Sequence, residues 1–180
     1  SRYPIHSVKA LYYKNSSNMS LIADVRINNQ YIRVINSHFE TTSVNAYRGI
    51  ITAPGKSLEV RAKAVKNLIL QMKDNNRKRA IQADSIHAEI QRSPYPVIVC
   101  GDFNDTPISY AHRTIQGPLK DAYAASGRGV GVTYNENFFW FRIDNILHSA
   151  NMKPINCTVD KVRYSDHYPL WCYLQLKEND

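Results

Sequence analysis

The sequence predicts an α+β fold, or a layered α/β fold, built around β-sheets. Three observations support this prediction. Apolar segments with the patterns of β-strands stand near both ends of the chain and in its middle. Segments with helical periodicity lie between them. The chain has 180 residues, which is enough for one domain with a real core and not comfortably for two.

Three strands are expected in the N-terminal part of the chain. Residues 8–14 and 20–27 are rich in apolar side chains, and the pair Asn28–Asn29 that follows is a turn signal. The next segment, QYIRVINSH, alternates with period two. Its residues on one face are Ile32, Val34 and Asn36. The sequence therefore predicts a hairpin that brings His38 to the end of a strand.

A loop and two helices are expected next. Residues 40–56 are polar and contain Gly and Pro, so they predict a loop. Ser57 can cap a helix whose apolar positions recur at helical spacing. These positions are Leu58, Ala62, Val65, Leu68, Ile69 and Met72. The segment NNRK at 75–78 interrupts the pattern, so a second helix is expected over residues 80–93, before two prolines.

The remaining segments predict one central strand, a short helix and three final strands. YPVIVC is a continuous apolar run, which is typical of a strand buried on both faces. A short helix is expected near residues 108–115, followed by a loop with three glycines. The final strands are expected in FRIDNILHS, INCTVDKVRY and HYPLWCYLQL. The resulting order is β-β-β-α-α-β-α-β-β-β, without a repeat or a low-complexity linker.

Composition excludes some classes of protein and favours others. An apolar content of 43% argues against a disordered chain. No apolar run reaches the roughly 18 residues that a membrane-spanning helix needs. Cys100 and Cys172 lie in apolar runs, and with Cys157 they fit no zinc pattern, so buried free thiols are expected. The formal net charge of +8 favours anionic partners such as nucleic acid, phosphorylated small molecules or acidic lipid surfaces, although it also serves solubility.

Polar residues follow or interrupt four of the predicted strands. They are Asn36 and His38 in INSH, Asp102, Asn104 and Asp105 in GDFND, Asp144 in RID, and Ser165, Asp166 and His167 in SDH. Each group alone has an ordinary explanation in turns or surface pairs. Together they stand where loops on a rigid sheet place reactive groups. Phosphate-ester hydrolysis needs this set: carboxylates for a hard divalent cation, a base for water, and groups that bind phosphoryl oxygens.

The motifs NSH, GDFND, RIDNIL and SDHYPL, in that order, resemble the endonuclease/exonuclease/phosphatase superfamily over essentially the whole chain. The resemblance implies a four-layer α/β/β/α sandwich of two mostly antiparallel sheets. It also implies a phosphoesterase that depends on Mg²⁺ or Mn²⁺ and hydrolyses a phosphodiester or phosphomonoester with activated water. The implied partner is a phosphate-ester substrate: nucleic acid, a phospholipid headgroup or a sugar phosphate.

The resemblance implies a catalytic role for four of these residues. Asp102 would orient or deprotonate the attacking water, and Asn104 would bind the phosphate and support that water. His167 would contact the scissile phosphate, while Asp144 would hydrogen-bond its ring and fix its tautomer. This last pairing also makes independent sense, because a histidine beside a buried carboxylate gains proton affinity and can stay cationic against a phosphate.

Three further residues receive roles from the same resemblance. His38 would bind a phosphoryl oxygen at the end of its strand, with Asn36 as a supporting phosphate-binding residue. Asp166 would be a metal ligand, directly or through water. A single carboxylate with water is a poor cage for Mg²⁺, so weak metal binding is expected.

The chain departs from the family pattern at its front. The family fold usually needs about 250 residues, and it begins with a strand ending in Asn and a strand ending in Gln-Glu, whose glutamate is a principal metal ligand. Neither pattern is found, and Glu40 lies on the wrong side of His38 to replace that glutamate. Residues 1–180 are thus expected to form one incomplete domain, with the N-terminal part of the fold missing. Weak or absent activity and self-association through exposed sheet edges are expected from this.

Other interpretations remain open at this stage. A non-catalytic module could hold nucleic acid or a phospholipid headgroup, but its carboxylates would repel the phosphate unless a metal intervened. A purely structural sandwich leaves the polar strand ends unexplained. No aromatic ladder or duplex-reading helix identifies the substrate. Bacterial proteins with a similar domain commonly carry hydrophobic helices ahead of it, so a membrane-tethered extracytoplasmic location and a cytoplasmic one are both open.

Overall fold

The structure is a computed structural model that describes residues 1–180 except residues 43, 137–139, 163 and 178–180. In this part of the chain, six strands form a sheet in the order β1-β2-β3-β4-β6-β5, and β7 pairs with β8 in a second sheet. The strands are β1 (Ile5–Tyr12), β2 (Met19–Ile27), β3 (Gln30–His38), β4 (Val97–Asp102), β5 (Lys120–Asp121), β6 (Asp144–His148), β7 (Met152–Val159) and β8 (Leu170–Leu176). The helices are α1 (Val44–Thr52), α2 (Leu58–Gln91), α3 (Tyr110–Gln116) and α4 (Ala122–Ser126).

The arrangement confirms the expected α+β class with two mostly antiparallel sheets. Among the described strand pairs, only β3 and β4 run parallel. The predicted hairpin is formed by β2 and β3, and Asn28 in its turn has a φ of 54°, a left-handed conformation that Asn tolerates. The apolar run at 97–100 lies in the centre of the sheet, between β3 and β6, as its composition predicts. β5 and α4 were not expected from the sequence.

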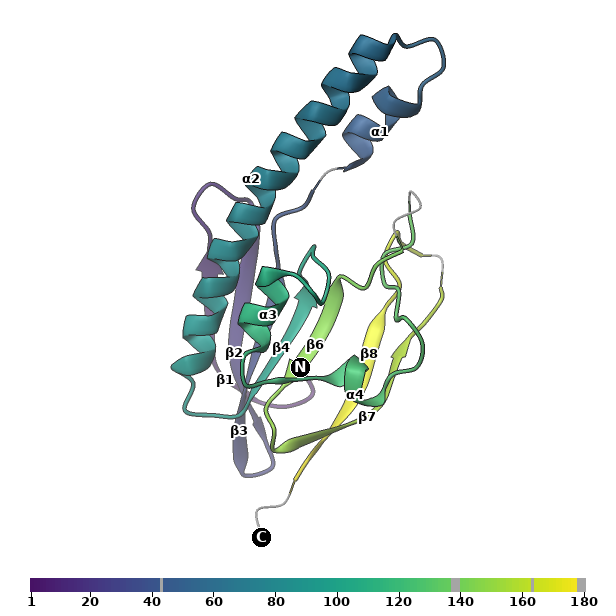
Figure 1. The fold of residues 1–180 in the computed structure, drawn as a ribbon. Coiled ribbons are helices and arrows are strands. Elements are labelled where there is room, and N and C mark those ends of the chain that lie inside the picture. The colour runs from purple at the N-terminus through teal and green to yellow at the C-terminus, as the bar shows by residue number, and fades with distance from the viewer. Residues whose placement is uncertain (43, 137–139, 163, 178–180) are drawn as a thin grey trace.

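Two apolar clusters hold the layers together. α2 and α3 lie on one face of the six-stranded sheet, where Ile86 and Ile115 are fully buried with Val99 and Leu147 (Figure 1). Successive strand residues point to opposite faces, so Ile146 faces the other side and packs with residues of α4, β7 and β8. The sheet is therefore covered on both sides around β4 and β6, the strands that end in predicted site residues.

The three cysteines are free, as expected, and Cys157 is buried while the other two are partly buried. Burial raises the pKa of the Cys100 thiol to about 11, so this thiol stays protonated and inert at neutral pH. No helix in the described part of the chain is long and apolar enough to cross a membrane.

β1 forms an edge of the larger sheet and carries exposed apolar side chains, Val8 and Tyr12 among them. An unpaired strand edge offers backbone donors and acceptors to another chain. Self-association through this edge stays a prediction of the sequence.

One expectation that the structure corrects concerns residues 40–56. They were predicted as a loop, but they contain the helix α1, Val44–Thr52. Pro54 and Gly55 mark the turn after α1, but Gly49 and Arg48 lie inside the helix. The helix itself forms because its apolar side packs against α2, a tertiary contact that local composition does not reveal.

A second correction concerns the expected break at 75–78. α2 continues without interruption from Leu58 to Gln91, with Ser57 as the expected N-cap. Two polar residues at or next to the break are buried and paired: the Asn75 amide donates to the Thr41 carbonyl oxygen at 2.8 Å, and the Arg79 guanidinium donates to the Glu40 carbonyl oxygen at 2.9 Å. These side chains fasten α2 to the chain that leaves β3, so their polarity marks buried contacts and not a helix end.

Candidate active site

Three neighbouring strands place His38, Asp102 and Asp144 at the same end of the larger sheet, where β3 and β4 end and β6 begins. We call this end the catalytic edge. β3 and β4 are parallel, so their carboxyl ends coincide and His38 lies opposite Asp102. β4 and β6 are antiparallel, so Asp144 at the start of β6 also lies opposite Asp102. His167 reaches the same edge from the segment before β8, held there by a bridge to Tyr134. Motifs far apart in the sequence thus meet at one point, as the sequence predicts.

His167 is paired with Asp144. Its Nδ1 lies 2.8 Å from the Asp144 Oδ2, and its Nε2 lies 4.0 Å from the Asp102 Oδ2. The hydrogen bond to Asp144 raises the pKa of His167, although burial of the ring opposes this shift. The pair therefore favours a cationic imidazole whose Nδ1–H points at the carboxylate, as the sequence-based role requires.

Asp102 is held in place by Asn104. The Asn104 backbone N–H donates to Oδ1 of Asp102 at 2.7 Å, and its amide donates to Oδ2 at 3.0 Å. Burial, and then the charge of Asp144, raise the pKa of Asp102 to about 6, against the opposing hydrogen bond from Asn104. A carboxylate that takes up a proton near neutral pH is suited to act as a general base.

The structure brings the other predicted site residues together only in part. His38 is exposed, with its Nε2 3.6 Å from the Asp102 Oδ2. Asn36 lies on the same exposed face of β3, two residues earlier. Asp166 is exposed, and its Oδ1 accepts a hydrogen bond from the Ser165 hydroxyl at 3.0 Å. Asp105 points to α2 and pairs with Arg79 at 3.3 Å, which agrees with a role in the turn.

Glu40 does not join this cluster. Its Oε1 pairs with the Lys78 ammonium at 3.1 Å, and its Oε2 accepts from the Ser16 hydroxyl at 2.7 Å. Both oxygens are thus engaged on the side of α2. This agrees with the expectation that Glu40 does not replace the glutamate of the family pattern.

The site fits a divalent cation by its donor set. In the described part of the chain, one ligand atom each of Asp102, Asp144 and His167 lies within 4.8 Å of the others. Two carboxylates only partly screened from each other account for part of the raised pKa of Asp102, and a cation would relieve this repulsion. Carboxylate oxygens suit Mg²⁺ and Mn²⁺, whereas the imidazole favours the second of these.

Two positioning features were missed in the sequence. Thr133 is fully buried, and its hydroxyl accepts hydrogen bonds from the backbone N–H groups of Ile143 and Asp144, both at 3.1 Å. Arg142 makes a buried two-point contact with Asp121, at 2.9 and 2.7 Å. Both contacts fix the backbone just before the Asp144 side chain. Arg142 stands within the RID motif and offered a signal, but nothing near Thr133 in the sequence did.

We expect the Asp144→Asn change to lower the pKa of His167. The neutral amide removes the negative charge and leaves at most a weaker, uncharged acceptor for Nδ1–H, while burial continues to lower the pKa of His167. NMR titration of the His167 ring in metal-free protein measures the effect. Asp160→Asn is the matched control, because Asp160 is exposed and bonds to Trp171 instead. An unchanged His167 titration in Asp144→Asn would contradict the pairing.

Comparisons with known proteins agree with this architecture. Residues 1–167 match the model of the Endonuclease/Exonuclease/phosphatase family. No curated protein sequence matches the chain. Among solved structures, an endonuclease/exonuclease/phosphatase of Bacteroides vulgatus has 19% identity and a TM-score of 0.68, with 97% of this chain and 67% of that chain covered.

Two further solved structures share the fold. The mannosyl-6-phosphatase of Bacteroides thetaiotaomicron has 16% identity and a TM-score of 0.63, with 97% of this chain and 67% of that chain covered. A humanized TDP2 of D. rerio has 17% identity and a TM-score of 0.64, with 95% of this chain and 67% of that chain covered. The family match over most of the chain and these shared folds lead to one conclusion: the chain belongs to the Endonuclease/Exonuclease/phosphatase family.

Proposed function

We propose that this protein is a divalent-metal-dependent phosphoesterase that hydrolyses a phosphodiester or phosphomonoester by in-line attack of water. The observation that carries the proposal is the pairing at the sheet edge: a carboxylate with a pKa of about 6, Asp102, lies beside His167, which is itself paired with Asp144 at 2.8 Å. Membership of the family and the fold shared with a mannosyl-6-phosphatase support it.

In this proposal Asp102 takes the proton of the attacking water. Its two oxygens are aimed by Asn104, which therefore sets where the water stands. Asn104 adopts a φ of 50°, and its amide also donates to the Phe39 carbonyl oxygen at 3.0 Å. The turn after β4 is thereby tied to the end of β3, and the amide dipole stays fixed beside the phosphate position.

The two histidines bind the phosphoryl oxygens. The hydrogen bond to Asp144 raises the pKa of His167 and so favours its cationic form, and its Nε2 lies on the side of Asp102. His38 stands on the other side, exposed and 3.6 Å from the same carboxylate, with Asn36 behind it on β3. Hydrogen-bond donors on both sides offset the negative charge that collects on the phosphoryl oxygens in the transition state.

Asp166 would hold the cation, as the family resemblance implies, together with a carboxylate oxygen of the Asp102–Asp144 pair, whereas His167 keeps its Nδ1 on Asp144 and is left to the phosphate. A bound divalent cation would neutralise phosphate charge and lower the pKa of a coordinated water. The residues of this chain supply the other functions: Asp102 takes the proton of the attacking water, the histidines bind phosphoryl oxygens, and Asn104 orients the Asp102 carboxylate.

We expect metal binding to be weak, because few carboxylates are available and Glu40 is engaged elsewhere. Isothermal titration with Mg²⁺ and Mn²⁺ measures it. Asp166→Asn should weaken binding further, and Asp160→Asn should not. Tight one-to-one binding by the wild-type chain would contradict this expectation, and equal affinities in the two variants would exclude Asp166 as a ligand.

A panel assay distinguishes the phosphoesterase from a binding module for nucleic acid or phospholipid headgroups. The panel contains nicked, abasic and plain DNA, sphingomyelin, inositol phosphates and sugar phosphates, each with Mg²⁺, with Mn²⁺ and with a chelator. Metal-dependent hydrolysis of one class supports the phosphoesterase and names its substrate. Binding of a phosphate ligand without hydrolysis of any ester would favour the binding module.

A further inference from the structure

The first half of α2 and the whole of α1 form an arm that extends past the edge of the larger sheet (Figure 1). The arm grows out of the catalytic edge, because α1 follows His38 at the end of β3 after a short connection. Asn75 and Arg79 mark where α2 is fastened to this connection. From Asn75 back to Leu58, α2 continues for about 25 Å at about 1.5 Å per residue.

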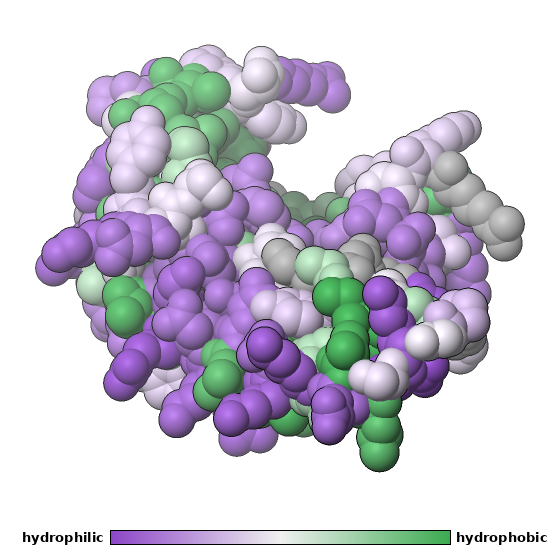
Figure 2. All heavy atoms as spheres, turned by 90° about the horizontal axis from the view of Figure 1, so that it is seen from above, coloured by the Kyte–Doolittle hydropathy of each residue, from purple (hydrophilic) through white to green (hydrophobic). Residues whose placement is uncertain are grey.

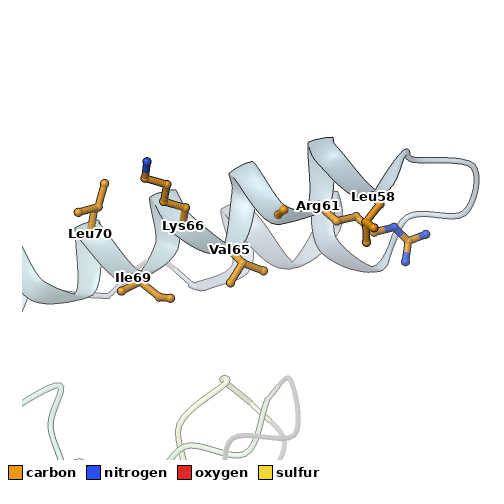
Figure 3. Close-up of a pocket in the computed structure, with 7 residues that line it drawn as sticks. Leu58, Arg61, Val65, Lys66, Ile69 and Leu70 are labelled. Carbon is orange, nitrogen blue, oxygen red and sulfur yellow. The ribbon is translucent and has the colours of Figure 1, made fainter.

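The arm carries large apolar side chains that nothing in the described structure covers. We call the residues Leu58, Ala62, Val65, Ile69 and Met72 the apolar stripe. Their spacing places them on one side of the helix, and Val65 and Ile69 point to the same side in Figure 3. Leu58 is 82% exposed and Ile69 is 59% exposed. Helical spacing alone predicted the helix at these positions, and only the second half of α2 lies over the sheet (Figure 1).

Exposed cations accompany the stripe. Lys66 and Lys73 follow Ala62 and Ile69 by four residues, so each lies one helical turn along α2 at the flank of the stripe. Arg77 continues this row. In Figure 3 Lys66 points away from Val65 and Ile69, to the side of Leu70. Figure 2 shows the molecule from above. In this view hydrophobic side chains gather among hydrophilic ones, and the surface is hollowed between two raised parts. An apolar stripe with a row of cations is the pattern of helices that lie in a membrane interface.

Aromatic side chains at the same end of the molecule add to this pattern. Trp140 precedes β6 and Tyr164 precedes β8, and both line one depression with Ser165 and Tyr168, next to His167 at the end of the sheet from which the arm extends. Tyr164 is 94% exposed and Trp140 is also largely exposed. Such amphipathic rings are favoured at the boundary between lipid headgroups and acyl chains.

We propose that the arm docks on an anionic phospholipid bilayer, with the apolar stripe in the boundary between headgroups and acyl chains and with Lys66, Lys73 and Arg77 against the lipid phosphates. The cations beside the stripe favour a bilayer over an apolar protein groove, because anionic lipid headgroups offer them complementary charge and an apolar groove does not. Docking holds the catalytic edge close to the membrane surface. It goes beyond the proposed phosphoesterase activity and does not depend on it.

Co-sedimentation of the full chain with vesicles tests the proposal. We expect binding to phosphatidylcholine vesicles that contain phosphatidylserine and at least tenfold weaker binding to pure phosphatidylcholine. The double change Val65→Ser and Ile69→Ser should abolish binding, whereas Ile81→Ser should not, although Ile81 is 61% exposed on the same helix. Lys66→Gln and Lys73→Gln should each weaken binding about fivefold, unlike Lys153→Gln on β7.

Circular dichroism of each variant shows whether it remains folded, and Ile69→Ser alone serves where the double variant unfolds. Equal binding to both kinds of vesicle, or loss of binding in Ile81→Ser as well, would overturn the proposal. So would the absence of binding to any vesicle. A concentration-dependent dimer that Ile69→Ser dissociates, without vesicle binding, would assign the stripe to a second copy of the chain instead.

Discussion

The Asp102→Asn variant is expected to lose turnover by a factor of about 10² to 10⁴, while it still binds substrate and phosphate. Asn keeps the shape of Asp102 and can still hydrogen-bond to Asn104, but it cannot take a proton from water. Without metal the pKa of Asp102 is raised to about 6, and a bound cation relieves part of this shift, so turnover of the metal-loaded protein should rise with pH at or below this range as the carboxylate ionises. Steady-state kinetics at several pH values measure both effects.

Asp84→Asn is the matched control for this change, because Asp84 is exposed on α2 and bonds only to the exposed Tyr110 hydroxyl in the described structure. Its turnover should equal that of the wild-type protein. Wild-type turnover in Asp102→Asn would rule out Asp102 as the base. A large rise in KM with unchanged kcat would assign Asp102 to substrate or metal binding instead.

The Gly101→Ala variant is expected to lose a large share of its stability. Gly101 has a φ of 131°, and an added Cβ would lie 2.0 Å from the backbone carbonyl oxygen of Ser37 on β3. The clash is between two paired strands and cannot be relieved by a side-chain rotation. Backbone strain costs about 1–3 kcal/mol and overpacking about 1–3 kcal/mol, so a loss of about 2–6 kcal/mol is expected. This is a large share of the stability of a typical domain.

Urea denaturation of Gly101→Ala and of a control, Gly49→Ala, measures this loss. An added Cβ at Gly49, inside α1, meets nothing within 4 Å, so the control should be neutral or slightly stabilising. A Gly101→Ala protein as stable as the wild-type protein would show that β3 and β4 are not paired as described.

The sequence indicates which strand ends carry the polar residues of the candidate site because these signals are local, whereas their catalytic roles stay a prediction. An apolar run that ends in Gly and Asp marks both the end of a strand and a carboxylate at that end. The same holds for His38 at the end of its alternating segment. Once β3, β4 and β6 are neighbours, their register alone brings His38, Asp102 and Asp144 together.

The supporting contacts could not be predicted, since they join residues that share no local pattern. Thr133 reaches the backbone of Asp144 across a loop, and Arg142 reaches Asp121 across α4. The predicted break in α2 was wrong for a related reason. Asn75 and Arg79 are polar because they hydrogen-bond to the chain after β3, whereas polar residues in a sequence more often indicate a solvent-exposed turn.

The apolar stripe on α2 is the reverse case: its residues are apolar in the sequence but exposed in the fold. Its helical spacing predicts a helix correctly, but spacing does not tell whether an apolar face is packed or exposed. The answer depends on where the sheet ends relative to the helix, which is a property of the whole fold. The arm therefore emerges as a feature only when α2 is seen beside the sheet (Figure 1).

The most direct test of the proposed phosphoesterase is a single-turnover hydrolysis in ¹⁸O-labelled water, with saturating Mn²⁺ and with the ester that the panel assay favours. We expect slow, metal-dependent cleavage that places one ¹⁸O atom in the phosphate product, because Asp102 directs water at phosphorus, and no cleavage in Asp102→Asn. Label in the alcohol product, or no cleavage of any ester by a folded chain that still binds phosphate, would contradict the proposal.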